Sequence, residues 1–68
     1  MDYDAYNQRM QSIHEQLEDI AEKTFRQAVV NAADYSNPDF IALMKRHKQL
    51  TDESARLVQA MLEHLGHG

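Results

Sequence analysis

The sequence contains no cysteine, so neither a disulfide bond nor a thiolate metal site can stabilise its fold. It also lacks tryptophan and contains a single proline and two glycines, which leaves few places where a helix must stop. No apolar run approaches the roughly 20 residues of a membrane-spanning helix. The fold must therefore rest on the packing of apolar side chains.

The beginning of the chain also lacks the features of a secretion signal. Residues 1–4 are acidic and polar, whereas a signal peptide begins basic and continues apolar. We therefore expect a cytoplasmic protein that has no membrane contact. The formal net charge is −4 at pH 7, and binding to the nucleic-acid backbone requires a basic surface, so we expect no nucleic-acid partner.

The chain is short for an independent domain. A chain of 68 residues is below the size at which a single hydrophobic core is comfortably stable without help. We therefore expect a protein partner or a homo-oligomer. A compact monomer with scattered exposed apolar residues is the competing interpretation.

Turn chemistry occurs in one place, residues 35–39, close to the middle of the chain. Asn37 is a good N-cap, because its side-chain oxygen can accept from backbone N–H groups of the first helical turn. Pro38 fits the first helical position, and Asp39 places negative charge at the positive end of the helix dipole. Because the residue before proline avoids the helical conformation, a continuous helical rod is disfavoured.

These signals predict an all-α fold, a two-helix antiparallel hairpin that forms a single domain over residues 1–68. We expect a first helix over about 3–33, a turn over 34–37 and a second helix over about 38–65. Thr51 precedes two acidic residues and resembles a helix start, so a break in the second helix near this position stays open. We also expect the hairpin to complete its core by self-association or with a partner.

Apolar residues recur at helical spacing on both predicted helices, which defines a seam on each. In the first helix the seam comprises Tyr3, Tyr6, Met10, Ile13, Leu17 and Ile20. In the second it comprises Phe40, Leu43, Met44, His47, Leu50, Ser54, Leu57, Val58, Met61 and Leu65. We expect His47 to be a buried histidine of the seam, and a pH-sensitive role is the alternative.

No residue pattern indicates catalysis, so we expect the protein not to be an enzyme and to bind no small-molecule substrate. The serines and threonines have no positioned base or glycine-rich elbow. The carboxylate pairs Glu15/Asp19 and Glu18/Glu22 share helix faces, but acid–base chemistry requires a cleft that two helices do not offer.

The histidines near the C-terminus are the best candidate metal ligands, and we expect them to bind none. His64 and His67 lie three residues apart beside Glu63, a spacing that suits one helical turn. Gly66 interrupts this turn, and a catalytic zinc site needs three rigidly held ligands. We therefore expect neither a metal nor another cofactor.

Two clusters of opposite charge would lie at neighbouring heights in a hairpin, where we expect surface pairing of little energetic value. The acidic cluster comprises Glu15, Glu18, Asp19 and Glu22, and the basic cluster comprises Lys45, Arg46 and Lys48.

Apolar side chains outside the seams are more informative. They cannot all face one neighbour, because successive helical residues are rotated by about 100°. The set comprises Phe25, Val29 and Val30 on the first helix and Ile41 and Leu62 on the second. Outward apolar side chains on a small domain indicate self-association or a partner helix. Tyr3 and Tyr6 are further candidate anchors, with end-of-seam packing as the alternative.

The stretch of residues 36–42, Ser-Asn-Pro-Asp-Phe-Ile-Ala, resembles the turn and second-helix start of type III secretion needle subunits. Residues 54–65 are loosely similar to the C-terminal helix by which such subunits stack. The size, acidity and hairpin plan also resemble the small co-chaperone that holds needle subunits unpolymerised in the cytoplasm. The resemblance implies a bacterial, non-enzymatic protein that engages other helices, and one that is secreted only if it is a needle-type subunit.

The sequence therefore favours a non-enzymatic helical assembly or chaperone-like protein that acts through apolar helix faces. The alternative is a small acidic helical regulator that binds and inhibits a larger protein.

Overall fold

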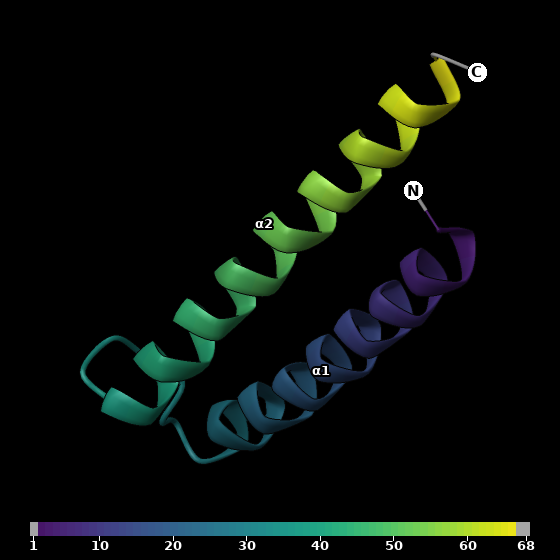
Figure 1. Cartoon of the computed structure of the whole chain (residues 1–68). Coiled ribbons are helices and arrows are strands. Elements are labelled where there is room, and N and C mark those ends of the chain that lie inside the picture. Colours follow the sequence, from purple (N-terminus) through teal and green to yellow (C-terminus); the bar gives the residue numbers. More distant parts are fainter. Residues whose placement is uncertain (1, 67–68) are drawn as a thin grey trace.

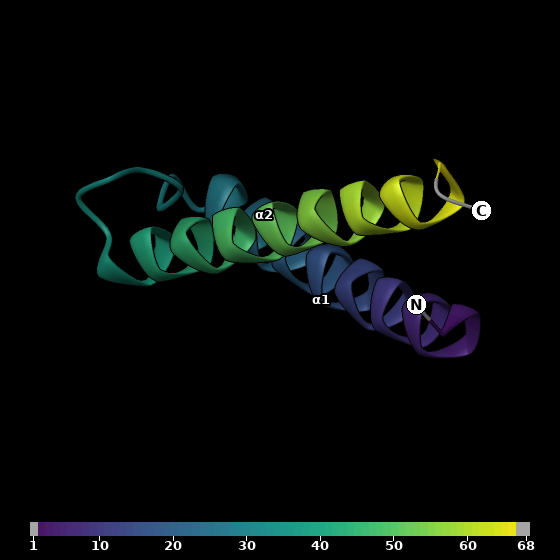
Figure 2. The ribbon, with the colours of Figure 1, turned by 45° about the horizontal axis from the view of Figure 1, so that its top comes forward.

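The computed structural model describes residues 2–66, which form two helices, α1 (Tyr3–Val29) and α2 (Pro38–Gly66). The two helices lie side by side and run in opposite directions, so both ends of the chain lie at the same end of the molecule (Figure 1). The hairpin measures 50 × 17 × 13 Å along its principal axes. The helices cross obliquely rather than running parallel (Figure 2). The predicted all-α antiparallel hairpin is confirmed.

The start of α1 is capped as its sequence predicts. Asp2 has extended backbone angles, and its side-chain Oδ1 accepts a hydrogen bond from the backbone N–H of Asp4 at 3.0 Å. This bond satisfies one of the N–H groups that lack a partner inside the helix.

The end of α1 comes earlier than expected, at Val29 rather than near residue 33. Asn31 adopts a left-handed conformation with φ of 59°. Its N–H donates to the carbonyl oxygen of Ala28 at 3.1 Å, and the N–H of Ala32 donates to that of Gln27 at 2.7 Å. This pair of bonds is a Schellman motif, which reverses the chain and satisfies the last helical carbonyls. The connection is therefore longer than the predicted turn.

Asn37 holds the other side of the connection, as predicted. Its Oδ1 accepts from the backbone N–H of Asp39 at 3.0 Å and caps α2. Its Nδ2 donates to the carbonyl oxygen of Ala32 at 2.8 Å, so one side chain joins the end of the Schellman motif to the start of α2.

Asp34 shapes the connection between these two caps. Its Oδ1 accepts from the hydroxyl of Ser36 and from the Ser36 backbone N–H, the latter at 2.8 Å. These bonds hold the pKa of the Asp34 carboxyl below its ordinary value, with the Ser36 hydroxyl contributing most. Nearby, the ring of Tyr35 packs edge-to-face on Phe40 with centroids 5.3 Å apart, which covers the turn end of the core.

α2 is unbroken, so the alternative of a break near Thr51 is wrong. The Thr51 hydroxyl donates to the carbonyl oxygen of Lys48 at 3.0 Å, three residues earlier in the same helix. Threonine can cap a helix or bond back along it, and here it does the second.

The core is a seam between the two helices, centred on Ile13, Ile20 and Leu50. Ile13 and Leu50 are 0% exposed. The half-buried residues that pack against this centre are Met10, Leu17, Leu43, Met44 and Leu57. The predicted seams are thereby confirmed at their centre.

The prediction that His47 is a buried residue of the seam is wrong, because its side chain is exposed. A straight helix drifts by about 20° for every seven residues, so a position that matches a heptad on paper can move to the edge of the seam. His47 lies at this edge.

Candidate docking surface

A hairpin of two helices has two flanks, one on each side of the plane that contains both axes. The polar flank is closed by side chains that bridge the helices. Arg9 forms a two-pronged ion pair with Glu53, in which Nη2 donates to Oε1 at 2.6 Å and Nε donates to Oε2. Arg46 Nη2 donates to Gln16 Oε1 at 2.7 Å. The hydrogen bonds from Arg9 lower the pKa of Glu53 and raise that of Arg9.

These two bridges also define the register of the hairpin. The residue numbers add to 62 in both pairs, Arg9 with Glu53 and Gln16 with Arg46. A residue of α1 therefore lies at about the same height as the α2 residue whose number completes that sum. This rule places Tyr3 at the height of Gln59, within one helical turn of Leu62 at the open end.

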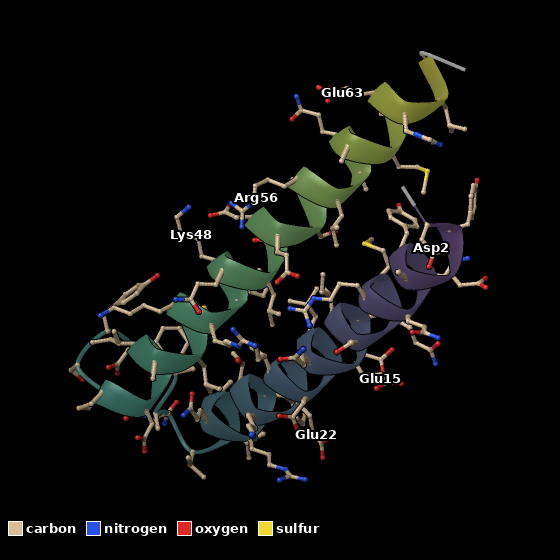
Figure 3. All side chains as sticks on the ribbon, in the orientation of Figure 1. Asp2, Glu15, Glu22, Lys48, Arg56 and Glu63 are labelled. Atoms are coloured by element: carbon tan, nitrogen blue, oxygen red, sulfur yellow. The ribbon has the colours of Figure 1, made fainter. Side chains whose placement is uncertain are left out.

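The ion pairs of the two charged clusters lie within single helices. Asp19 contacts Lys23 at 2.8 Å, Glu22 bonds Arg26, and Lys48 contacts Asp52 at 3.0 Å. Glu22 projects from the side of α1 that faces away from α2, and Lys48 projects from the far side of α2 (Figure 3). The expected cross-helix pairing is therefore wrong for these residues, because similar height does not place side chains on facing sides.

The opposite flank is apolar and open near the turn. Phe25 is nine residues from Gln16, which is two and a half helical turns, so it lies on the other side of α1. A groove of about 420 Å³ runs between the helices here. It is lined by Leu17, Ile20, Ala21, Thr24, Phe25, Ala28, Met44 and His47.

The floor of this groove is imperfectly packed. The hydroxyl oxygen of Thr24, which lines the groove, is buried and has no hydrogen-bond partner within residues 2–66. The same holds for Oε1 of Gln27, which faces the opposite, polar flank at the turn end of the seam. A buried polar atom without a partner costs about 1–3 kcal/mol. The seam is therefore weakest at the turn end, beside the open groove.

The apolar flank continues along α2 toward the open end. Met44, Thr51, Val58 and Leu65 recur every seven residues, which keeps them on one side of the helix. Leu62 follows Val58 by four residues and is 63% exposed. We define the apolar flank by Ala21, Phe25, Ala28, Met44, Val58, Leu62 and Leu65.

The predicted docking residues do not form one patch. Those that expose more than half of their surface are Tyr3, Phe25, Val29, Val30 and Leu62. Val29 follows Phe25 by four residues and adjoins it on the helix surface. Val30 is rotated by about 140° from Phe25, which places it off the apolar flank. Tyr3 and Leu62 share the open end.

Two of the predicted docking residues are half-buried, Tyr6 in the seam between the helices and Ile41 one turn before Met44. For Tyr6, the location agrees with the alternative of end-of-seam packing. Both contribute less free surface than the sequence suggests.

Several residues of the flank were not among the predicted docking residues: Ala21, Ala28, Met44, Val58 and Leu65. The last three were assigned to the main seam of α2. Met44 does pack against the core, whereas Val58 is 38% exposed and Leu65 is 55% exposed. The detectable signal is a second seven-residue repeat, one position after the repeat formed by Leu43, Leu50 and Leu57. A helix with two adjacent repeats of this kind can contact neighbours on two sides.

A hollow of about 440 Å³ lies on the polar flank, lined by Lys23, Arg26, Gln27, Asp39, Ala42 and Leu43. Its rim is charged, and such a rim keeps its water more readily than the apolar rim of the opposite groove. The polar hollow is therefore the weaker candidate for binding a helix.

Other chemistry leaves no organised site in the part of the chain that is described. Within residues 2–66, no three histidine or carboxylate side chains come together as a metal site would require. His67, one of the two histidines weighed as metal ligands, lies outside the described residues. Neither α1 nor α2 has the length and apolar character needed to span a bilayer.

No protein family, curated protein or solved structure matches this chain, so its function must be argued from the apolar flank itself.

Proposed function

We propose that this protein is a non-enzymatic helical assembly or chaperone-like protein, which binds the helices of another protein through its apolar flank. The observation that carries this proposal is the exposed apolar stripe beside an open groove, with Phe25 69% exposed at its edge. Helices recognise such grooves by inserting apolar side chains spaced three and four residues apart. The alanines at 21 and 28 allow a partner backbone to approach closely.

The class of partner is suggested by the resemblance of residues 36–42 to type III secretion needle subunits. On this basis we propose a component of a type III secretion system that handles helical subunits in the cytoplasm.

A pull-down from the native host tests the proposal. We expect the tagged chain to capture secretion subunits and to lose them in the variant Phe25→Glu, which places a charge on the apolar flank. Val30→Glu is the matched control, because it introduces the same charge at an exposed valine off this flank. Capture of a polymerase or nuclease would instead support the acidic regulator, and capture that is unaffected by Phe25→Glu would exclude the flank as the binding surface.

A further inference from the structure

The hairpin exposes more surface than a compact chain of its mass. Its accessible surface is 5110 Å², whereas a folded monomer of 7.9 kDa is expected to expose about 4,400 Å². The excess is roughly 700 Å², and a stable interface of standard size covers about 800 Å² on each partner. One interface of ordinary size would therefore bring the surface of the chain close to that of a compact protein.

We propose that a second copy of this chain covers the apolar flank and forms a two-fold symmetric four-helix bundle with both turns at the same end. The symmetry axis then runs parallel to the helices. Each α1 lies over the α2 of the other copy and runs antiparallel to it. Such an interface uses the same patch of both copies and is closed, so association stops at the dimer.

The apolar positions of the two copies meet in this arrangement. By the register rule, Phe25 lies at the height of Asn37, beside the first turn of α2, so its ring faces the start of α2 in the partner copy. At the open end, Leu62 lies near the height of Tyr3 and is covered by the tyrosine of the other copy. Both ends of the flank are thus covered by large apolar side chains.

The charges at the rim distinguish the dimer with both turns at the same end from a dimer with the turns at opposite ends. Glu18 and Lys48 are exposed on the outer edges of α1 and α2, and their heights differ by about one helical turn of ~5.4 Å. With the turns at the same end, Glu18 of each copy borders Lys48 of the other at the rim of the interface. Opposite charges at a rim favour this orientation.

The arrangement with the turns at opposite ends is disfavoured. It stacks α1 on α1 and α2 on α2. When the two flanks overlap along their whole length, from the height of Phe25 to that of Leu62, the centre of symmetry lies near Lys48. The two Lys48 side chains then lie close together at the rim, and like charges repel.

The dimer uses the same apolar flank as the proposed function, and it rests on that function only because both need the flank to be an interface. If both inferences hold, self-association and partner binding compete for the apolar flank. A purified chain is then a dimer that must open before it binds a partner helix.

Sedimentation equilibrium of the full chain over a wide concentration range tests the dimer. We expect a monomer–dimer equilibrium, weakened at least about thirtyfold by Phe25→Glu or Leu62→Glu, because either change places a charge among the apolar side chains of the interface. Val30→Glu should leave the dimerisation constant unchanged. Circular dichroism confirms that each variant remains helical, and Leu62→Ala provides a milder change if a charged variant unfolds.

The rim pair gives a second test through charge reversal. Glu18→Lys and Lys48→Glu should each weaken the dimer by roughly two- to fivefold, as for exposed ion pairs, and the double variant should recover the loss. Failure of the double variant to recover would overturn the orientation.

A single spin label at Glu63→Cys measures the orientation directly, since the chain has no other cysteine. With the turns at the same end, the two labels are separated only by the width of the bundle, about 3 nm or less. With the turns opposed, they lie about 4 nm apart along the axis alone, at 1.5 Å per residue.

A chain that stays monomeric at all concentrations, or a dimer that persists in Phe25→Glu, would overturn this inference. The proposed function would fail separately, by capture of the partner that is insensitive to Phe25→Glu.

Discussion

The side chain of Asn37 joins the ends of both helices. Its oxygen caps α2, and its nitrogen fixes Ala32, which ends the Schellman motif of α1. The two bonds use different atoms of one amide, so substitutions can separate them.

Asn37→Ala loses both bonds and should lower the free energy of unfolding by about 1.5–2 kcal/mol. Asn37→Asp keeps an oxygen for the cap but cannot donate to Ala32, so it should cost about half as much. Urea unfolding followed by circular dichroism measures both values. Equal losses in the two variants would show that the cap contributes little.

The ion pair of Arg9 with Glu53 should make stability depend on pH at the acid end. The pKa of Glu53 is depressed in the folded chain, chiefly by the hydrogen bonds from Arg9. The stabilisation is therefore fully present above the ordinary glutamate pKa of 4.5, and it is lost as the pH falls through the lower folded value. The pKa of Asp34 is also lowered in the folded chain, so this residue likewise loses stabilisation as the pH falls.

We expect Glu53→Gln to flatten the acid limb of a plot of melting temperature against pH. The double variant should flatten it to the same extent, because it lacks the same carboxylate. Arg9→Gln should flatten it somewhat less, because Arg56 and Arg46 still lower the pKa of Glu53. An acid limb as steep in Glu53→Gln as in the parent chain would contradict this assignment.

At the scale of the helices, the end of α1 depends on one left-handed residue. Asn31→Gly should be neutral or stabilise the hairpin by a few tenths of a kcal/mol, because glycine reaches positive φ without strain. Asn31→Val should cost about 1–2 kcal/mol, since a branched side chain clashes in this conformation. Thermal unfolding of the two variants provides the comparison, and a valine variant as stable as the glycine one would exclude the Schellman end.

The start of α2 could be predicted from sequence, whereas the end of α1 could not. Asn37 and Pro38 are strong local signals that need no tertiary context. Asn31 has no such signal, because the alanines and valines around it are compatible with a continuing helix. Its left-handed conformation follows from the path of the chain toward α2.

The same reasoning applies to the candidate docking surface. Phe25 and Leu62 stand outside the main seams, so their exposure could be predicted. Val58 and Leu65 could not be separated from the seam, because a seven-residue repeat identifies a stripe but not which neighbour it faces. The pairing of Arg9 with Glu53 depends on register, which the length of the connection sets.

At the scale of the whole molecule, the core consists of one layer of side chains between two helices. Leu50 is 0% exposed, and Leu50→Ala should cost about 2–5 kcal/mol through lost contacts and a cavity. Most of the stability of a protein helix comes from the packing of its apolar face, and the two helices share one seam, so both should be lost in one transition. Circular dichroism at high dilution checks whether the two helices unfold together.

The control is Leu65→Ala, at an exposed leucine of the same helix, which should change the free energy of unfolding by less than about 0.5 kcal/mol. Helicity retained in Leu50→Ala would contradict the one-layer core.

The elongated shape, 50 × 17 × 13 Å, has a consequence for how the molecule tumbles. Backbone N–H bonds in both helices point nearly along the long axis, so their nuclear relaxation reports end-over-end rotation, which is slow for a rod. N–H bonds in the connection point in other directions and also sample faster rotation about the long axis. A face-to-face dimer thickens the rod without lengthening it, so the spread of relaxation rates between helices and connection should narrow as protein concentration rises. End-to-end association would widen this spread.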